Sequence, residues 1–483
     1  MRLHPVLVRT ALVAASSLGG LSAQNPPAGF TYQTLVDGPI VSGTAMAFLP
    51  TGELLITERE TGRIRVYRDG ALVSAPWATV PVTGGGSYAE QGLLGIAADP
   101  DFLNNRFVYV YYTATSGTEC RIARLQEAGG IGTNFTVLTA PGALPSQLYH
   151  NGGTMVFGQD GCLYVATGDG LSGGNAVDMS NWLGKVLRFS VPSPTAAPSL
   201  GIPQDNPFPG SAIFSFGHRN QFGLAVHPVS GVLYQTENGG ALRDEINRIV
   251  AGGNYGWPTF EGYETTPNPN FVDPLAWYQP TTAPTGMGFY TGDHYPAAYR
   301  NAWFFMDYNQ GRLHQVNLDA AGTSVLSQSI FDSHPGAGYA VTTGPDGNLY
   351  VLVNDIGGFG ADELGRYVHA NEAATSVQLS MVSNKALGGS VTTCVHAPNG
   401  SLTARWLSLT RLQTPLPTVF GNLWVPADAM MPYTLVTADA RSYLAVSLPN
   451  VPSFLGSDLH MQALVFQPTG AFGLTGASTL TLR

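Results

Sequence analysis

The sequence predicts an all-β protein, in which a six-bladed β-propeller is followed by a small C-terminal β-sandwich. The 483-residue chain contains 59 glycines and 34 prolines, and charged residues make up only 11% of it. This composition is typical of many short strands joined by turns. A strand–turn–strand unit also recurs along the chain, and the pattern changes near residue 370.

The recurring unit is an apolar strand, a turn that contains glycine, and a second strand rich in Leu, Tyr and Val, which is the signature of a β-hairpin. Four clear and two more degenerate copies occupy residues 48–55, 157–164, 226–234, 343–350, 92–112 and 302–316. Six such units at a period of tens of residues predict a propeller with six blades. Their irregular spacing predicts loop insertions at residues 190–211 and 258–281.

Three segments follow from these patterns. Residues 1–23 resemble a secretory signal peptide, with Arg2 and Arg9 before a short apolar stretch and a small-residue cleavage site at residues 21–23; the alternative is a short buried helix. The propeller is expected at residues 30–370, and the short, separate strands of residues 371–483 indicate the β-sandwich. No later segment is apolar for long enough to span a bilayer. We therefore expect an exported protein, periplasmic or secreted, without a transmembrane segment.

Charge and cysteine content exclude some classes of function. The net charge is −10 and the only lysines are Lys185 and Lys385, so no basic stripe for nucleic acid is present. Export permits a disulfide, and Cys120 with Cys162 is a candidate pair, although Cys394 would then be left over. The spacing does not indicate zinc, and buried thiols are the simpler interpretation.

Two polar pairs stand at the ends of predicted strands. His150 precedes one strand of a hairpin and Asp169 follows the other. Because neighbouring strands lie about 4.8 Å apart, the imidazole can meet the carboxylate and form a general base. A structural hydrogen bond is the alternative for this pair. Arg219 and Asn220 occupy the matching position in the next unit, which suggests either a shared cavity at the propeller axis or hydrogen bonds between blades.

A third cluster combines glycines with carboxylates. Gly239 and Gly240 precede Asp244 and Glu245, and Tyr255 follows. Hard cations such as Ca²⁺ bind carboxylates and backbone carbonyls, and glycines allow carbonyls to converge. The spacing is not that of an EF-hand loop, so solvated turns are an equally simple interpretation of the pattern alone.

Taken as an ordered set, these motifs resemble those of the soluble quinoprotein glucose dehydrogenases, also called aldose sugar or glucose/sorbosone dehydrogenases. The resemblance covers roughly residues 39–369. The segments that carry it are Glu90-Gln91-Gly92-Leu93-Leu94-Gly95, His150-Asn151-Gly152-Gly153, Gly168-Asp169-Gly170, Leu183-Gly184-Lys185, His218-Arg219-Asn220, Asp244-Glu245-Ile246-Asn247 and Asn254-Tyr255-Gly256-Trp257-Pro258.

The resemblance implies an exported six-bladed propeller that binds pyrroloquinoline quinone. His150 matches the base that takes the proton of the sugar's anomeric hydroxyl, and Asp169 matches the carboxylate beside it. Gln91 matches the substrate-side amide. Arg219 matches the cation near the reacting quinone oxygen, and Asn220 lies on the cofactor side.

The resemblance also implies Ca²⁺. The carbonyls of Gly239 and Gly240 match ligands of the ion that holds the quinone. Glu245 and the carbonyl of Tyr255 match ligands of a second, structural ion.

The chain departs from the family in the residues that bind the carboxylates of the quinone. Better-known members use a lysine in the unit around residues 306–311 and a pair of arginines before Gly344, and neither is present here. Arg312 or Arg300 are the candidate substitutes. Losing charge-assisted hydrogen bonds to a carboxylate costs about 1.5–3 kcal/mol each, or roughly tenfold in affinity.

The retained residues favour a dehydrogenase that oxidises the anomeric hydroxyl of an aldose to a lactone, with hydride transfer to the quinone. Two alternatives stay open: a non-catalytic propeller that binds carbohydrate or protein, and hydrolysis at the same pocket. Sugar preference is expected to lie in residues 259–286. The sequence does not identify the electron acceptor.

Overall fold

The computed structural model describes residues 26–83, 89–262, 268–292, 294–333, 336–355 and 362–370, and beyond them the strands between residues 378 and 481. The predicted signal peptide, residues 1–23, lies outside the described residues. Within the described residues, no helix has the length and apolar composition that a membrane crossing needs.

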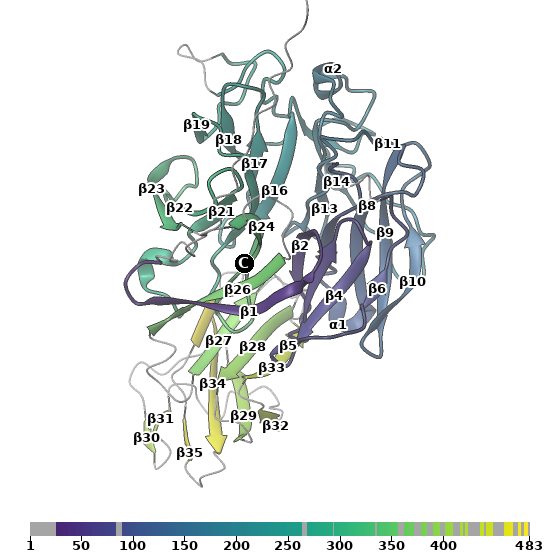
Figure 1. Ribbon diagram of the computed structural model, residues 1–483. Helices are drawn as coiled ribbons and strands as arrows, with labels where there is room; N and C mark the ends of the chain where they lie inside the picture. The colour runs from purple at the N-terminus through teal and green to yellow at the C-terminus, as the bar shows by residue number, and fades with distance from the viewer. Residues whose placement is uncertain are drawn as a thin grey trace, which may run out of the picture.

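Six antiparallel sheets follow one another along the chain and form the blades of a propeller (Figure 1). The predicted fold class is thereby confirmed for the propeller. The first three blades, each given from its inner to its outer strand, are β2 (Gly43–Phe48), β3 (Leu54–Glu58), β4 (Arg63–Arg68) and β5 (Ala71–Leu72), with β6 (Ala78–Thr79) also on β4; β7 (Leu93–Ala98), β8 (Phe107–Thr113), β9 (Glu119–Ala128) and β10 (Ile131–Val137), with β11 (Leu144–Pro145) also on β9; and β12 (Met155–Phe157), β13 (Leu163–Ala166), β14 (Lys185–Phe189) and β15 (Ile213–Phe216).

The other three blades follow the same plan. They are β16 (Asn220–Val226), β17 (Leu233–Asn238), β18 (Asp244–Arg248) and β19 (Ala276–Tyr278); β20 (Pro284–Phe289), β21 (Trp303–Asp307), β22 (Arg312–Leu318) and β23 (Val325–Asp332); and β24 (Gly336–Thr343), β25 (Leu349–Asp355), β26 (Asp362–His369) and β1 (Phe30–Ile40). The short helices α1 (Phe102–Asn105), α2 (Gly173–Val177) and η1 (Ala297–Tyr299) lie in connections.

The first strand of the propeller closes its last blade. In Figure 1, β1 (purple) lies alongside β26 (green), and Phe30 pairs with His369 and Tyr32 with Tyr367. The two ends of the propeller chain are thus held in one sheet, which ties the ring of blades together.

Apolar side chains fill the spaces between neighbouring blades. Leu55, Trp77 and Tyr112 belong to a buried cluster between the first two blades, whereas Tyr109 and Phe157 belong to the cluster between the second and third. Successive side chains of a strand point to opposite faces of the blade, so one strand packs against both neighbouring blades. This arrangement explains why several strands are buried along their whole length.

The repeats predicted from the sequence correspond to hairpins, with one shift. Five of them are the hairpin of the first and second strands of a blade, whereas residues 302–316 form the second and third strands, β21 and β22. The inner strand of that blade, β20, precedes the predicted unit. The insertion at residues 190–211 lies between β14 and β15, and the one at 258–281 contains β19.

The strands beyond residue 377 form separate sheets. They are β27 (Gln378–Ser383), β28 (Ser390–His396) and β33 (Arg441–Ser447) in one sheet; β32 (Leu435–Ala438), β29 (Ser401–Ser408), β34 (Asp458–Phe466), β35 (Phe472–Leu474) and β36 (Ser478–Thr481) in a second; and the pair β30 (Leu416–Thr418) and β31 (Gly421–Leu423). The β-sandwich at residues 371–483 and the domain boundaries remain predictions.

The candidate disulfide is not formed. Cys120 and Cys162 are both buried free thiols. Cys120 packs in the cluster between the second and third blades, and Cys162 packs in the cluster on the other side of the third blade. The body of a blade therefore separates the two sulfur atoms.

A channel of about 580 Å³ lies between the inner strands of the six blades. It is lined from Thr44, Thr154 and Phe222 near the starts of these strands to Pro100 and Pro345 beyond their ends. The predicted site residues His150 and Arg219 precede inner strands β12 and β16, so they lie at the end of the channel where those strands start.

Candidate active site

His150 and Asp169 form a close pair at this end of the propeller. The Nδ1 atom of His150 lies 2.7 Å from Oδ1 of Asp169, and both side chains are buried. His150 has a positive φ of 59°, which is uncommon for a residue other than glycine. A Cβ atom on Gly168 would lie 2.2 Å from the backbone oxygen of His150, so only glycine fits beside this turn. The two predicted residues are therefore brought together as expected.

Two further groups hold the Asp169 carboxylate in place, and a third hydrogen bond holds its backbone. Its Oδ2 accepts a 2.9 Å hydrogen bond from the indole Nε1 of Trp257, and its Oδ1 accepts one of 2.9 Å from the backbone N–H of Leu171. The backbone N–H of Asp169 donates to the carbonyl of Arg219 at 2.7 Å. With Nδ1–H of His150 donated to Asp169, Nε2 is the ring nitrogen left to accept a proton.

Arg219 and Asn220 adjoin this pair. The guanidinium of Arg219 lies 5.4 Å from the centre of the Trp257 ring and donates to the carbonyl of Asn238 at 3.1 Å. Asn220 is buried, and its Oδ1 has no hydrogen-bond partner. An unpaired buried acceptor is costly, so a donor from a ligand would satisfy it.

The Gln91 side-chain amide is bonded to groups other than His150, Asp169, Arg219 and Asn220. Its Nε2 donates to the carbonyl of Gly117 at 2.7 Å and to Oγ of Ser146 at 3.2 Å. The neighbouring Glu90 accepts a 2.6 Å hydrogen bond from the backbone N–H of His150. The predicted role of Gln91 in binding substrate thus remains a prediction, while Glu90 is the side chain of this motif that contacts the site.

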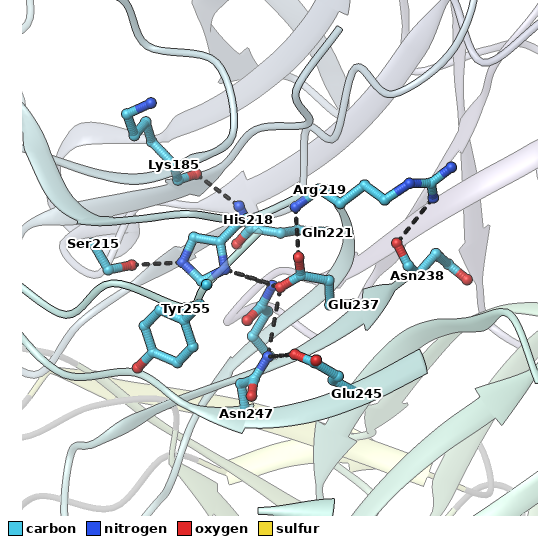
Figure 2. Close-up of polar contacts among 12 residues, drawn as sticks. Lys185, Ser215, His218, Arg219, Gln221, Glu237, Asn238, Glu245, Asn247 and Tyr255 are labelled. Atoms are coloured by element: carbon cyan, nitrogen blue, oxygen red, sulfur yellow. Dashed lines mark hydrogen bonds and ion pairs between the residues drawn. The ribbon is translucent and has the colours of Figure 1, made fainter. Parts of the chain in front are cut away.

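Sequence reasoning missed a second histidine–carboxylate pair, drawn in Figure 2. Nδ1 of the fully buried His218 lies 2.9 Å from Oε2 of Glu237, and the ring stacks on Tyr255 at 4.4 Å. The other carboxylate oxygen, Oε1, accepts the backbone N–H of Arg219 at 2.5 Å. This pair therefore fixes the backbone that presents Arg219. The signal was available, since His218 precedes β16 and Glu237 lies near the end of its partner strand β17, much as His150 and Asp169 flank β12 and β13.

Several residues of the predicted calcium cluster line one small cavity. The cavity is about 10 Å³, the scale of one water molecule or ion, and is lined by Arg219, Glu237, Gly239, Glu245, Tyr255, Trp257, Phe260 and Glu261. Burial, and then the nearby Glu237 carboxylate, raise the pKa of Glu245 to about 8. Gly240 does not line this cavity, although a Cβ on it would lie 2.5 Å from Oε1 of Glu261.

This cavity has the chemistry of a cation site but not a finished ligand set. Three carboxylates crowd a space of ionic size, and a cation would relieve their repulsion. Across the part of the chain that the structure describes, however, no three His, Cys, Asp or Glu side chains are arranged to hold a metal ion. The residues thus fit calcium in kind, and ligation would require the carboxylates to draw together.

Arg300 and Arg312, the two candidate substitutes for the basic residues that would bind the quinone carboxylates, lie at different places in the structure. Arg300 lies where the channel is lined by Pro100 and Pro345, at the end away from His150. Arg312 starts β22, paired with Asp307. Arg300 therefore cannot serve a cofactor bound beside Arg219.

Together, the fold and the site define a six-bladed β-propeller with a carboxylate-backed histidine and an arginine around one end of the central channel. The sequence profile of the family described as glucose/sorbosone dehydrogenase matches residues 41–359. The chain belongs to this family.

Known relatives agree with this assignment. The chain is 28% identical over 339 residues to "Aldose sugar dehydrogenase YliI" of Escherichia coli, covering 65% of this chain and 87% of that protein. It is 33% identical over 253 residues to "Quinoprotein glucose dehydrogenase B" of Acinetobacter calcoaceticus, covering 46% and 51%. The solved structure of the PQQ-bound aldose sugar dehydrogenase of Streptomyces coelicolor superposes with a TM-score of 0.56 at 27% identity, covering 71% of this chain and all of that one.

Proposed function

We propose that this protein oxidises the anomeric hydroxyl of an aldose to the lactone, with pyrroloquinoline quinone as cofactor. The observation that carries the proposal is the 2.7 Å pair of His150 and Asp169, next to Arg219 at one end of the channel. Membership of the family supports oxidoreductase chemistry, and the names of two relatives supply the aldose and the quinone.

His150 would act as the general base. Because its Nδ1–H is donated to Asp169, Nε2 accepts the proton of the anomeric hydroxyl, and the Asp169 carboxylate stabilises the imidazolium that forms. The bound quinone supplies the acceptor for the hydride that leaves the anomeric carbon. Arg219 would supply positive charge to stabilise the negative charge that develops on the bound acceptor.

The residues fit the cofactor at its reacting end. Arg219 supplies the cation, and the unpaired Oδ1 of Asn220 is a buried polar atom that awaits a partner. At the carboxylate end, residues 306–311 and 336–341 contain no lysine or arginine. We therefore expect the quinone to bind more weakly here than in relatives that have the basic grip.

Calcium is the second proposed cofactor. The carbonyl group of Gly239 would bind the ion that holds the quinone, and Glu245 with the carbonyl group of Tyr255 would bind the second, structural ion. All three residues line one cavity of ionic size. The predicted carbonyl ligand Gly240 lies beside Glu261 and outside the cavity, so its role remains a prediction.

The test is a titration of the mature protein with pyrroloquinoline quinone in the presence of Ca²⁺, followed by dye reduction on a panel of aldoses. Turnover that depends on the quinone and is abolished in His150→Ala supports the proposal. His227→Ala is the matched control, because His227 lies in the turn between β16 and β17, where its Nδ1 accepts from the N–H of Ser230. No binding and no turnover would refute the enzyme and leave a propeller that only binds a ligand.

A further inference from the structure

Glu90 is the carboxylate that contacts the His150 turn without any role in the predicted site. It precedes β7 of the second blade, whereas His150 precedes β12 of the third. Its Oε2 accepts the backbone N–H of His150 at 2.6 Å, and its own backbone N–H donates to the carbonyl of Leu148 at 2.8 Å. Glu90 thus binds this turn at two points, through its side chain at His150 and through its backbone at Leu148.

This grip acts on a strained backbone. His150 has a φ of 59°, a backbone conformation that residues other than glycine keep only when the surrounding structure imposes it. The same conformation directs the N–H toward Glu90 while the ring meets Asp169 at 2.7 Å. Releasing the N–H would let the turn relax and carry the imidazole away from Asp169.

Glu90 also reaches the cofactor side. Nδ2 of Asn220 lies 3.4 Å from each of its carboxylate oxygens. One side chain from the second blade therefore contacts the starts of the third and fourth blades. Burial raises the pKa of the Glu90 carboxyl, and the hydrogen bond from the His150 N–H opposes that rise.

We propose that Glu90 is a positioning residue, which holds His150 in its catalytic orientation and fixes Asn220 beside it. This inference rests on the proposed function of His150. His150 thus contacts two carboxylates, Asp169 through its ring and Glu90 through its backbone N–H. In this segment the sequence had favoured the neighbouring Gln91.

Two variants separate the hydrogen bond from the charge. Glu90→Ala removes the acceptor for the His150 N–H. Glu90→Gln keeps a carbonyl oxygen for that N–H. Its new NH₂ group faces the Nδ2 of Asn220, so the Asn220 amide must turn over to accept from it through Oδ1, which has no partner at present. Glu127→Gln is the control, since Glu127 is a blade-two carboxylate that pairs with Arg106 at 3.7 Å.

The first measurement is the crystal structure of each variant without quinone. We expect Glu90→Ala to take His150 out of the positive φ region and to lengthen its contact with Asp169 beyond about 3.5 Å. Glu90→Gln and Glu127→Gln should keep both features. A Glu90→Ala structure with the His150 turn unchanged would overturn the proposal.

Kinetics give the second readout. A misplaced base affects the chemical step, so Glu90→Ala should lower kcat by about 10²-fold, with a much smaller change in KM. Glu90→Gln should recover about tenfold of this loss, because a neutral acceptor keeps about half the strength of a charged one. A loss confined to KM, or no recovery in Glu90→Gln, would contradict a positioning role.

Two failures remain distinguishable. If the wild type shows no turnover, the proposed function fails while the crystal structures still decide whether Glu90 holds the turn. If Glu90→Ala does not fold, Glu90→Asp replaces it, because the shorter side chain withdraws the carboxylate from the His150 N–H. An unchanged turn in folded Glu90→Asp would then overturn the proposal.

Discussion

Trp257 donates its indole N–H to Oδ2 of Asp169 at 2.9 Å, the carboxylate oxygen that His150 does not contact. Asp169 is thereby held from both sides, by the imidazole on Oδ1 and by the indole on Oδ2. The Trp257 ring also carries the Arg219 guanidinium 5.4 Å from its centre. One aromatic side chain therefore supports both the proposed base and the proposed cation.

Trp257→Phe should lower kcat by about tenfold or more, because a hydrogen bond to a charged group contributes about 1.5–3 kcal/mol. The phenyl ring keeps an aromatic face for Arg219, so quinone affinity should change much less. The measurement is steady-state kinetics with a quinone titration of each variant. Trp277→Phe is the matched control, since Trp277 likewise carries an arginine, Arg243, at 4.2 Å. Equal effects of the two substitutions would contradict a specific role for the indole N–H.

Asp169→Asn should lower kcat far more than it lowers quinone binding. The amide no longer stabilises an imidazolium and can favour the wrong ring tautomer, which in a comparable His–Asp pair costs up to about 10⁴-fold. Because size and most hydrogen bonds are kept, the melting temperature should stay near that of the wild type. A variant with wild-type kcat would show that the contact of His150 with Asp169 is structural only.

Lys185→Met should destabilise the Asp169 loop. The buried ammonium donates to the carbonyls of Asn175, Ala176 and Leu183 at 2.7, 3.0 and 2.7 Å. Asn175 in turn donates its Nδ2 to the carbonyl of Asp169 at 2.8 Å. Burial lowers the pKa of Lys185 to about 8, so the charged form is held at neutral pH by these acceptors.

Methionine fills a similar volume but removes the donor from three carbonyls, of which that of Ala176 keeps the backbone N–H of Gly217. Each carbonyl left buried without a partner costs about 1–3 kcal/mol. We expect a loss of about 3 kcal/mol or more in the free energy of unfolding, measured by urea denaturation. Arg63→Met, at an exposed position of β4, is the control for loss of a positive charge. A Lys185→Met protein as stable as this control would refute the role of the ammonium.

The fold was largely predictable because its signal is local. Each hairpin carries its own apolar strands and glycine turn. The pairing of β1 with β26 was not predictable in this way, since it joins residues more than 300 positions apart. The inner strand β20 was missed because it contains Gly286 and Gly288, which weaken a strand pattern. A Cβ on Gly286 would lie 2.1 Å from the carbonyl of Tyr339. The close packing of neighbouring inner strands therefore requires glycine here, and the same glycine weakens the sequence pattern of the strand.

The site was predictable where partners flank the same hairpin, as His150 and Asp169 do. Glu90 and Gln91 show the limit. Adjacent residues of an extended segment point in opposite directions, and the sequence does not say which of them faces the axis. The approach of Trp257 to Asp169 across 88 positions likewise depends on how the blades close.

The junction of the first and last blades should respond to pH through Asp362. This buried carboxyl accepts the backbone N–H of Gly43, and its Oδ1 has no partner. Burial raises its pKa from 3.8 to about 7; the Gly43 N–H opposes the rise, Glu58 and Glu60 add to it, and Arg59 opposes it. The folded state therefore keeps the proton on Asp362 to higher pH than the unfolded state does. The contribution of Asp362 to the free energy of unfolding is thus fully present below about pH 4 and is lost as the pH rises to 7.

Asp362→Asn should remove this dependence, because the amide keeps an acceptor for Gly43 and cannot ionise. Relative to the wild type, the variant should gain stability between pH 4 and pH 7, by up to about 4 kcal/mol for a shift of roughly three pKa units. Denaturant unfolding at several pH values measures the difference, and Asp69→Asn, whose side chain is 79% exposed, controls for net charge. Parallel stability curves for the wild type and Asp362→Asn would mean that Asp362 is already ionised in the folded protein, with its charge balanced by Arg59.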